Sequence, residues 1–65
     1  MSREYTMYRE SNEAEVKSLV ELGVITKRKG ADVMAVLTEH YSDFMYMGVT
    51  ERVDMARDMR PTVHA

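Results

Sequence analysis

The chain has 65 residues, no cysteine and a formal net charge of −2 from nine basic and eleven acidic side chains. This length allows one domain at most, and the absence of cysteine excludes disulfides and thiolate metal sites. A near-balanced charge argues against a general nucleic-acid binder, which carries a basic excess. The sequence holds neither an apolar run near the ~18 residues of a membrane span nor a signal-peptide pattern, so we expect a soluble, cytoplasmic protein.

The N-terminal segment, residues 1–11, mixes aromatic and polar residues without a clear period, and we expect it to form a flexible arm. A helix is predicted over residues 12–22, because Asn12 is a good N-cap and Glu15 follows three residues later, as in a capping box. Gly23 is placed to end this helix in a left-handed conformation.

A longer second helix is predicted to end at Met47. It begins either at Lys27, after a Thr26 cap, or only near Ala31, since Gly30 weakens a helix. Its apolar residues cover more than half of the helix circumference, which is typical of a central helix contacted by several neighbours. These residues are Val33, Met34, Val36, Leu37, Tyr41, Phe44, Met45 and Met47.

A third helix is predicted over residues 50–60, with Thr50 as its N-cap and Pro61 as its stop. Gly48 is expected to end the preceding helix in a left-handed conformation. Residues 61–65 are expected to form a short C-terminal tail.

The predicted fold class is therefore all-α, with three helices joined by short loops in a domain over residues 12–60. Leu19, Leu37, Tyr41 and Phe44 are expected to be among its most buried side chains. A core of this size supplies only about 3–5 kcal/mol, so we expect self-association, most simply as a homodimer, to complete the structure.

Lys27, Arg28 and Lys29 form a small basic cluster in an otherwise mixed sequence. If a helix begins here, its free N–H groups and three cations could hold a phosphate, which supports an alternative function as a small nucleic-acid-binding regulator. Both glycine-containing junctions lack the residue pattern of a helix-turn-helix motif, and no strand or Gly-rich loop precedes the cluster. This alternative therefore rests on the basic cluster and the helix start, without a supporting motif.

The sequence shows no pattern that indicates catalysis. His40 and Asp43 are spaced to meet on one helix, but two ligands on one helix do not make a metal site. No serine, histidine and acid are placed together by a recognisable nucleophile motif. We therefore expect a protein that is not an enzyme, with no catalytic residue, no metal and no cofactor.

Methionine is unusually frequent, with seven residues in 65. Methionine fills irregular gaps in cores, but it is also frequent on adaptable binding surfaces, where tyrosine is enriched as well. The predicted partner-binding residues are Met45, Tyr46, Met47, Met55 and Met59. They predict a small non-enzymatic helical module for protein–protein interaction: an inhibitor, adaptor or regulator of another protein. Small size, no cysteine and Met-rich helices are features of many small phage and bacterial accessory proteins, and no motif ties this chain to one family.

Overall fold

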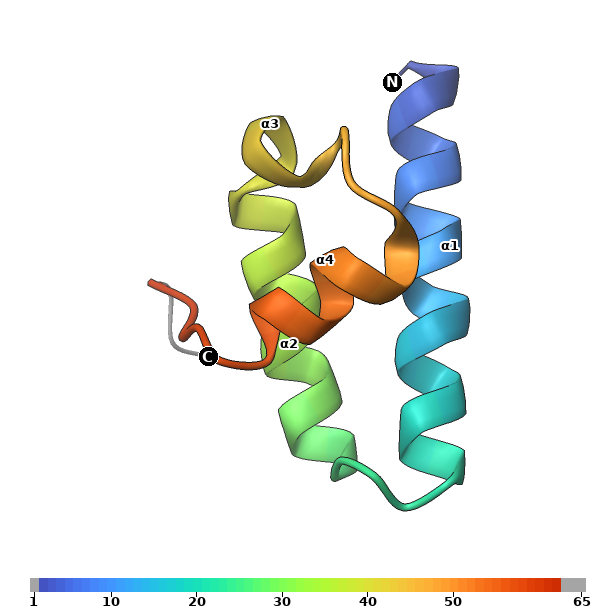
Figure 1. Cartoon of the computed structure of the whole chain (residues 1–65), viewed down its shortest axis with the longest axis vertical. Coiled ribbons are helices and arrows are strands. Elements are labelled where there is room, and N and C mark those ends of the chain that lie inside the picture. The colour runs from blue at the N-terminus through green and yellow to red at the C-terminus, as the bar shows by residue number, and fades with distance from the viewer. Residues whose placement is uncertain (1, 63–65) are drawn as a thin grey trace.

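The computed structural model describes residues 2–62, and these contain α-helices and no strand (Figure 1). The all-α prediction is confirmed for this part of the chain. The helices are α1 (Arg3–Glu21), α2 (Lys27–Glu39), α3 (Tyr41–Phe44) and α4 (Val49–Ala56).

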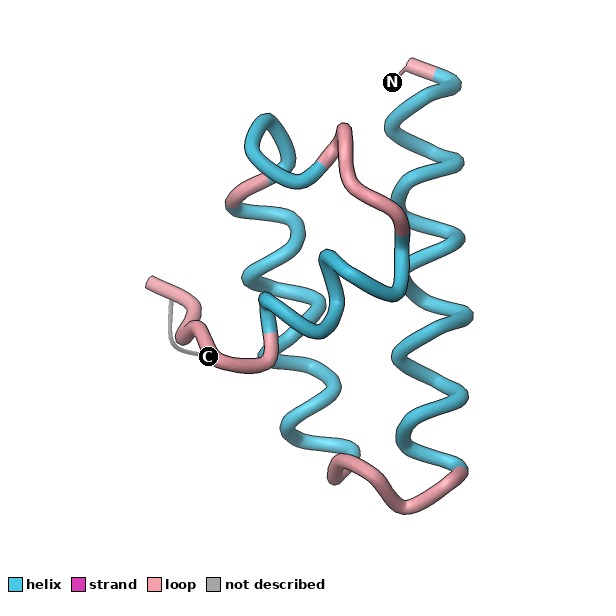
Figure 2. Tube along the Cα trace, viewed as in Figure 1, coloured by secondary structure: helices cyan, strands magenta, loops and turns pink. Residues whose placement is uncertain are grey.

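The three main helices pack against one another in every pairing (Figure 2). α1 and α2 lie side by side and run in opposite directions, and α4 crosses both of them. α3 is a single turn that follows the end of α2. The core lies where α4 crosses the other two helices, and its most buried apolar side chains are Val33, Val36, Leu37, Val53 and Ala56.

α1 begins at Arg3, so the prediction of a flexible arm is wrong for residues 3–11. The hydroxyl oxygen of Ser2 accepts a hydrogen bond from the backbone N–H of Tyr5 at 3.1 Å, which is the N-cap contact of this helix. Asn12 is therefore not a cap. It is a buried residue in the middle of the helix.

The connection between α1 and α2 agrees with the sequence analysis. Gly23 has a φ of 76°, as predicted. The N–H groups of Val24 and Gly23 donate to the carbonyls of Leu19 (2.9 Å) and Val20 (3.0 Å), which is the Schellman pattern. Thr26 then caps α2, so of the two predicted start points for this helix the earlier one is confirmed.

The long second helix predicted to reach residue 47 is interrupted at His40, whose φ and ψ are −110° and 33°. The interruption redirects the chain so that Phe44 enters the core, where it is 3% exposed. It also places the ring of Tyr41 edge-on to those of Tyr5 and Tyr8, at centroid distances of 5.1 and 4.7 Å. Tertiary packing therefore overrides the helical pattern in this segment.

Gly48 has a φ of −63° and precedes α4 as its N-cap, so the predicted left-handed conformation is wrong. Because a separate turn already follows Phe44, no helix remains for Gly48 to end. α4 starts at Val49 without a cap from Thr50, and it ends at Ala56. The predicted end at residue 60 is wrong, since the chain tightens into turns after Ala56.

The predicted core is confirmed at Leu37 and Phe44, which are 0% and 3% exposed. It is wrong at Leu19 and Tyr41, which are only partly buried and pack against the edge of the core. The predicted tail at 61–65 lies largely outside the described residues. Within them, the N–H and hydroxyl of Thr62 donate to the carboxylate of Glu39 at 2.8–3.0 Å, joining this end to α2.

Candidate interaction surface

A buried arginine joins α4 to α1. Arg52 is only 6% exposed, and its Nε donates to Asn12 Oδ1 at 2.6 Å. Its Nη2 donates to Ser11 Oγ at 2.7 Å and to the carbonyl of Tyr8 at 3.4 Å, while Nη1 donates to the carbonyl of Met47 at 2.7 Å. This guanidinium therefore fixes both the crossing of the helices and the loop before α4.

Tyr8 completes this cluster from α1. The guanidinium carbon of Arg52 lies 4.4 Å from the centre of the Tyr8 ring, within the range of a cation–π contact. The Tyr8 hydroxyl donates to the carbonyl of Leu37 at 2.6 Å, so one side chain links α1, α2 and α4. Burial raises the pKa of Tyr8 above its usual value, and the Asn12 amide and the Arg52 charge partly oppose this rise.

No carboxylate among residues 2–62 forms an ion pair with Arg52. A guanidinium has five N–H groups, and the four bonds given above all go to neutral oxygens. The positive charge is therefore held by dipoles and by an aromatic face. A buried charge held in this way adds a local positive potential to the surface above it.

A depression of about 350 Å³ lies over this cluster and reaches Arg52. Met7 on α1 and Met45 after α3 form its thioether walls, and Glu4 contributes a carboxylate to its lining. Met7 is 61% exposed, and Met45 is also exposed. We call this hollow the Arg52 depression, and we call Met7, Met45 and Tyr46 together the Met7 surface.

The predicted partner-binding residues separate into two groups. Tyr46 is 86% exposed, and Met45 and Met55 are also exposed. Met47 and Met59 instead pack partly buried against the core. Met7 and Arg52 are absent from the predicted site, because the segment that carries Met7 lacks a clear period and arginine is rarely buried.

The alternative basic site occupies the first turn of α2. Lys27 and Arg28 are exposed, Lys29 is half-buried, and the N–H of Lys29 is already bonded to Thr26 Oγ1 at 3.0 Å. The three cations therefore share one corner of the molecule, at the end of α1 opposite to Met7.

The His40–Asp43 pair singled out in the sequence lies where α2 ends and α3 begins. His40 Nδ1 lies 3.5 Å from Asp43 Oδ2, as their spacing predicts, and the pair is partly exposed. Within residues 2–62 no group of three or more potential ligands could hold a metal ion. The helices described here are also too short or too polar to cross a bilayer.

Comparison of the chain with protein-family models, with curated proteins and with solved structures finds no match in any of the three.

Proposed function

We propose that this protein is a small non-enzymatic helical module that binds another protein through the Met7 surface. The observation that carries the proposal is the exposure of Met7 and Met45 in the lining of a depression with a buried cation beneath it, together with the exposed Tyr46 that follows Met45 in the chain. Methionine and tyrosine are enriched at the centres of protein interfaces, where they supply adaptable apolar area and one polar group.

The loop that carries Met45 and Tyr46 is held in place before any partner arrives. Arg52 Nη1 bonds the carbonyl of Met47 at 2.7 Å, and the Met47 N–H donates to the carbonyl of Phe44 at 3.0 Å. A surface that is ordered in advance loses less conformational entropy on binding. This property supports a binding role for the surface.

The Arg52 depression also indicates the chemistry of the partner. Its thioether walls fit an apolar side chain, and the positive potential of Arg52 favours a neighbouring carboxylate. The partner segment that fits best carries an apolar residue next to an acidic one, with the acidic group placed away from Glu4. The module would act by occupying that segment, as an inhibitor, adaptor or regulator does.

The test is affinity capture from a lysate of the cells that produce the protein, with and without nuclease. A Met7→Ser/Tyr46→Ser variant alters two exposed side chains and leaves the core intact. The matched control replaces Lys27, Arg28 and Lys29 by Gln. We expect a protein partner that survives nuclease, is retained by the control and is lost from the Met7/Tyr46 variant. Loss on nuclease treatment and in the Gln variant would instead support the nucleic-acid alternative.

A further inference from the structure

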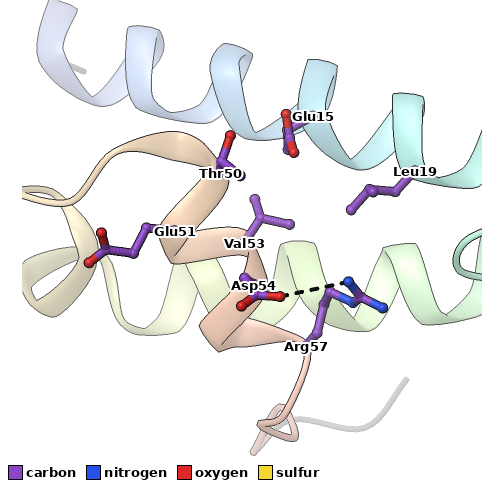
Figure 3. A pocket seen from close by; sticks show the side chains of 7 residues that line it. All are labelled: Glu15, Leu19, Thr50, Glu51, Val53, Asp54 and Arg57. Carbon is purple, nitrogen blue, oxygen red and sulfur yellow. Dashed lines mark ion pairs between the residues drawn. The ribbon is translucent and has the colours of Figure 1, made fainter.

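A second depression, of about 350 Å³, lies between α1 and α4 on another part of the surface (Figure 3). Leu19 and Val53 form its apolar floor, and Glu15 stands at its edge on α1; Glu51 of α4 also lines it, with its carboxylate directed away from Leu19. Neither of these two glutamates forms an ion pair within residues 2–62. The remaining charges of this depression are Asp54 and Arg57, which face each other at 3.8 Å. We call this hollow the acidic depression.

The α1–α2 corner has the opposite character. Leu22 is 75% exposed, Val24 is 49% exposed, and the cations Lys27 and Arg28 follow in the first turn of α2. The Schellman bonds and the Thr26 cap hold this corner in one conformation. The molecule thus presents a rigid aliphatic projection with a basic edge, and it also carries an apolar hollow with an acidic edge.

We propose that these two features bind each other between two copies of the chain, so that the corner of one copy enters the acidic depression of the other. The charge complementarity favours this occupant, because unpaired carboxylates on one side meet unpaired cations on the other. The aliphatic side chains of the corner match the apolar floor of the hollow. The Met7 surface takes no part, so the proposal stands independently of the proposed function.

The geometry of α1 allows the contact to be made twice in one dimer. Glu15 and Leu22 are seven residues apart, so they lie on the same side of the helix and about 10 Å apart along its axis. A two-fold axis near Ser18, midway between them, places each Leu22 at the level of the other copy's Glu15. Ser18 is exposed and small, which lets the two α1 helices approach closely. The contact is therefore reciprocal and closes as a dimer.

A charge-exchange experiment tests this arrangement. The variant Glu15→Lys/Glu51→Lys makes the hollow basic, like the corner. The variant Lys27→Glu/Arg28→Glu makes the corner acidic, like the hollow. In both variants, groups of the same charge would meet in the dimer. Each variant alone is therefore expected to dimerise at least about tenfold more weakly than the wild type at low salt. An equimolar mixture of the two restores both complementary contacts, so we expect a heterodimer of nearly wild-type strength. The control Glu10→Lys/Asp58→Lys makes the same change in charge at two exposed positions that line neither the hollow nor the corner, and it should dimerise like the wild type.

The measurement is sedimentation equilibrium from micromolar to millimolar protein, at low and high salt, with circular dichroism to confirm that each variant is folded. Leu22→Asp gives an independent check, since this side chain is exposed and contributes little to the fold, and it is expected to be monomeric where the wild type is dimeric. A wild type that stays monomeric throughout overturns the proposal. So does a dimer that survives in Leu22→Asp or in both charge variants. Dimerisation is measured without any partner protein, so a failure to capture a partner through the Met7 surface would not affect this test.

Discussion

Arg52 gives the most direct test of how the fold is held together. Replacing Arg52 by Met keeps most of the apolar stem against Tyr8 and removes the guanidinium with its four hydrogen bonds. Asn12 Oδ1 and the carbonyl of Met47 then lose a charged donor. A hydrogen bond to a charged group contributes about 1.5–3 kcal/mol, and the buried cation–π contact adds up to roughly 2 kcal/mol.

The opposing effect is that the variant no longer buries a charge. Replacing a buried charge by an apolar residue often leaves the free energy of unfolding unchanged or raises it. This effect alone would favour Arg52→Met. Arg52→Met removes only the donor, and the buried oxygens that accepted its hydrogen bonds remain without a partner. Leaving such groups unsatisfied costs more free energy than replacing both partners by apolar groups. We therefore expect Arg52→Met to destabilise the protein by about 2–4 kcal/mol, a large part of the roughly 3–5 kcal/mol available to a domain of this size.

Urea denaturation followed by circular dichroism measures this change, and thermal melting should show Tm lower by at least about 8 °C. A double-mutant cycle with Asn12→Ala isolates the bond between the two side chains, and we expect a coupling energy of about 1–3 kcal/mol. An Arg52→Met variant as stable as the wild type, or more so, would show that desolvation of the charge outweighs its hydrogen bonds. That result would refute the reasoning.

Three further predictions follow from single positions. Leu37→Ala should cost about 2–5 kcal/mol, because Leu37 is 0% exposed in the core, and an unchanged Tm would contradict its central place. Gly23→Ala should cost about 1 kcal/mol through its positive φ alone, whereas Gly48→Ala, at φ −63°, carries no such strain and should cost less, because only the weaker N-cap preference of Ala opposes the gain in chain stiffness; equal losses in urea titrations would refute the assignment of conformation. Burial raises the pKa of Tyr8, so the folded state keeps a proton that the unfolded state releases near pH 10. Stability should therefore fall as the pH rises above about 10, and Tyr8→Phe should flatten that part of the profile of unfolding free energy against pH.

Local signals in the sequence were sufficient wherever a short motif determines the structure. Gly23 has no neighbouring atoms that would clash with a Cβ, so its conformation follows from the backbone alone. Thr26 likewise needs only the N–H three residues later. Both positions could therefore be predicted without knowledge of the fold.

The start of α1 was predictable in principle and was missed. Ser2 is a favoured N-cap residue, and the buried residues Tyr8, Asn12 and Val16 follow one another at intervals of four, which is a helical period. Reading Asn12 as a cap hid this period, because asparagine favours helix ends when it is exposed. The buried amide of Asn12 is satisfied by a hydrogen bond from Arg52, which lies forty residues away in the sequence.

The remaining errors arise from contacts between distant segments. Nothing local breaks the helix at His40, since neither glycine nor proline is present there. The break instead coincides with non-local packing, since Phe44 is buried in the core and the ring of Tyr41 packs edge-on against two rings of α1. The predicted left-handed Gly48 fails for the same reason, since it assumed a continuous helix before it. Non-local packing of this kind becomes visible only when the arrangement of the helices is known.

The same arginine connects the stability of the fold to the proposed binding surface. Arg52 bonds the Met47 carbonyl, and Met47 lies two residues after Met45 in the loop that carries Tyr46. Loss of this bond would free the loop, so weaker binding in an Arg52 variant would not by itself identify a contact residue. Met7→Ser and Tyr46→Ser leave the network untouched, because both side chains are exposed and outside its hydrogen bonds. Comparing the two kinds of variant therefore separates contact with the partner from the ordering that makes the contact possible.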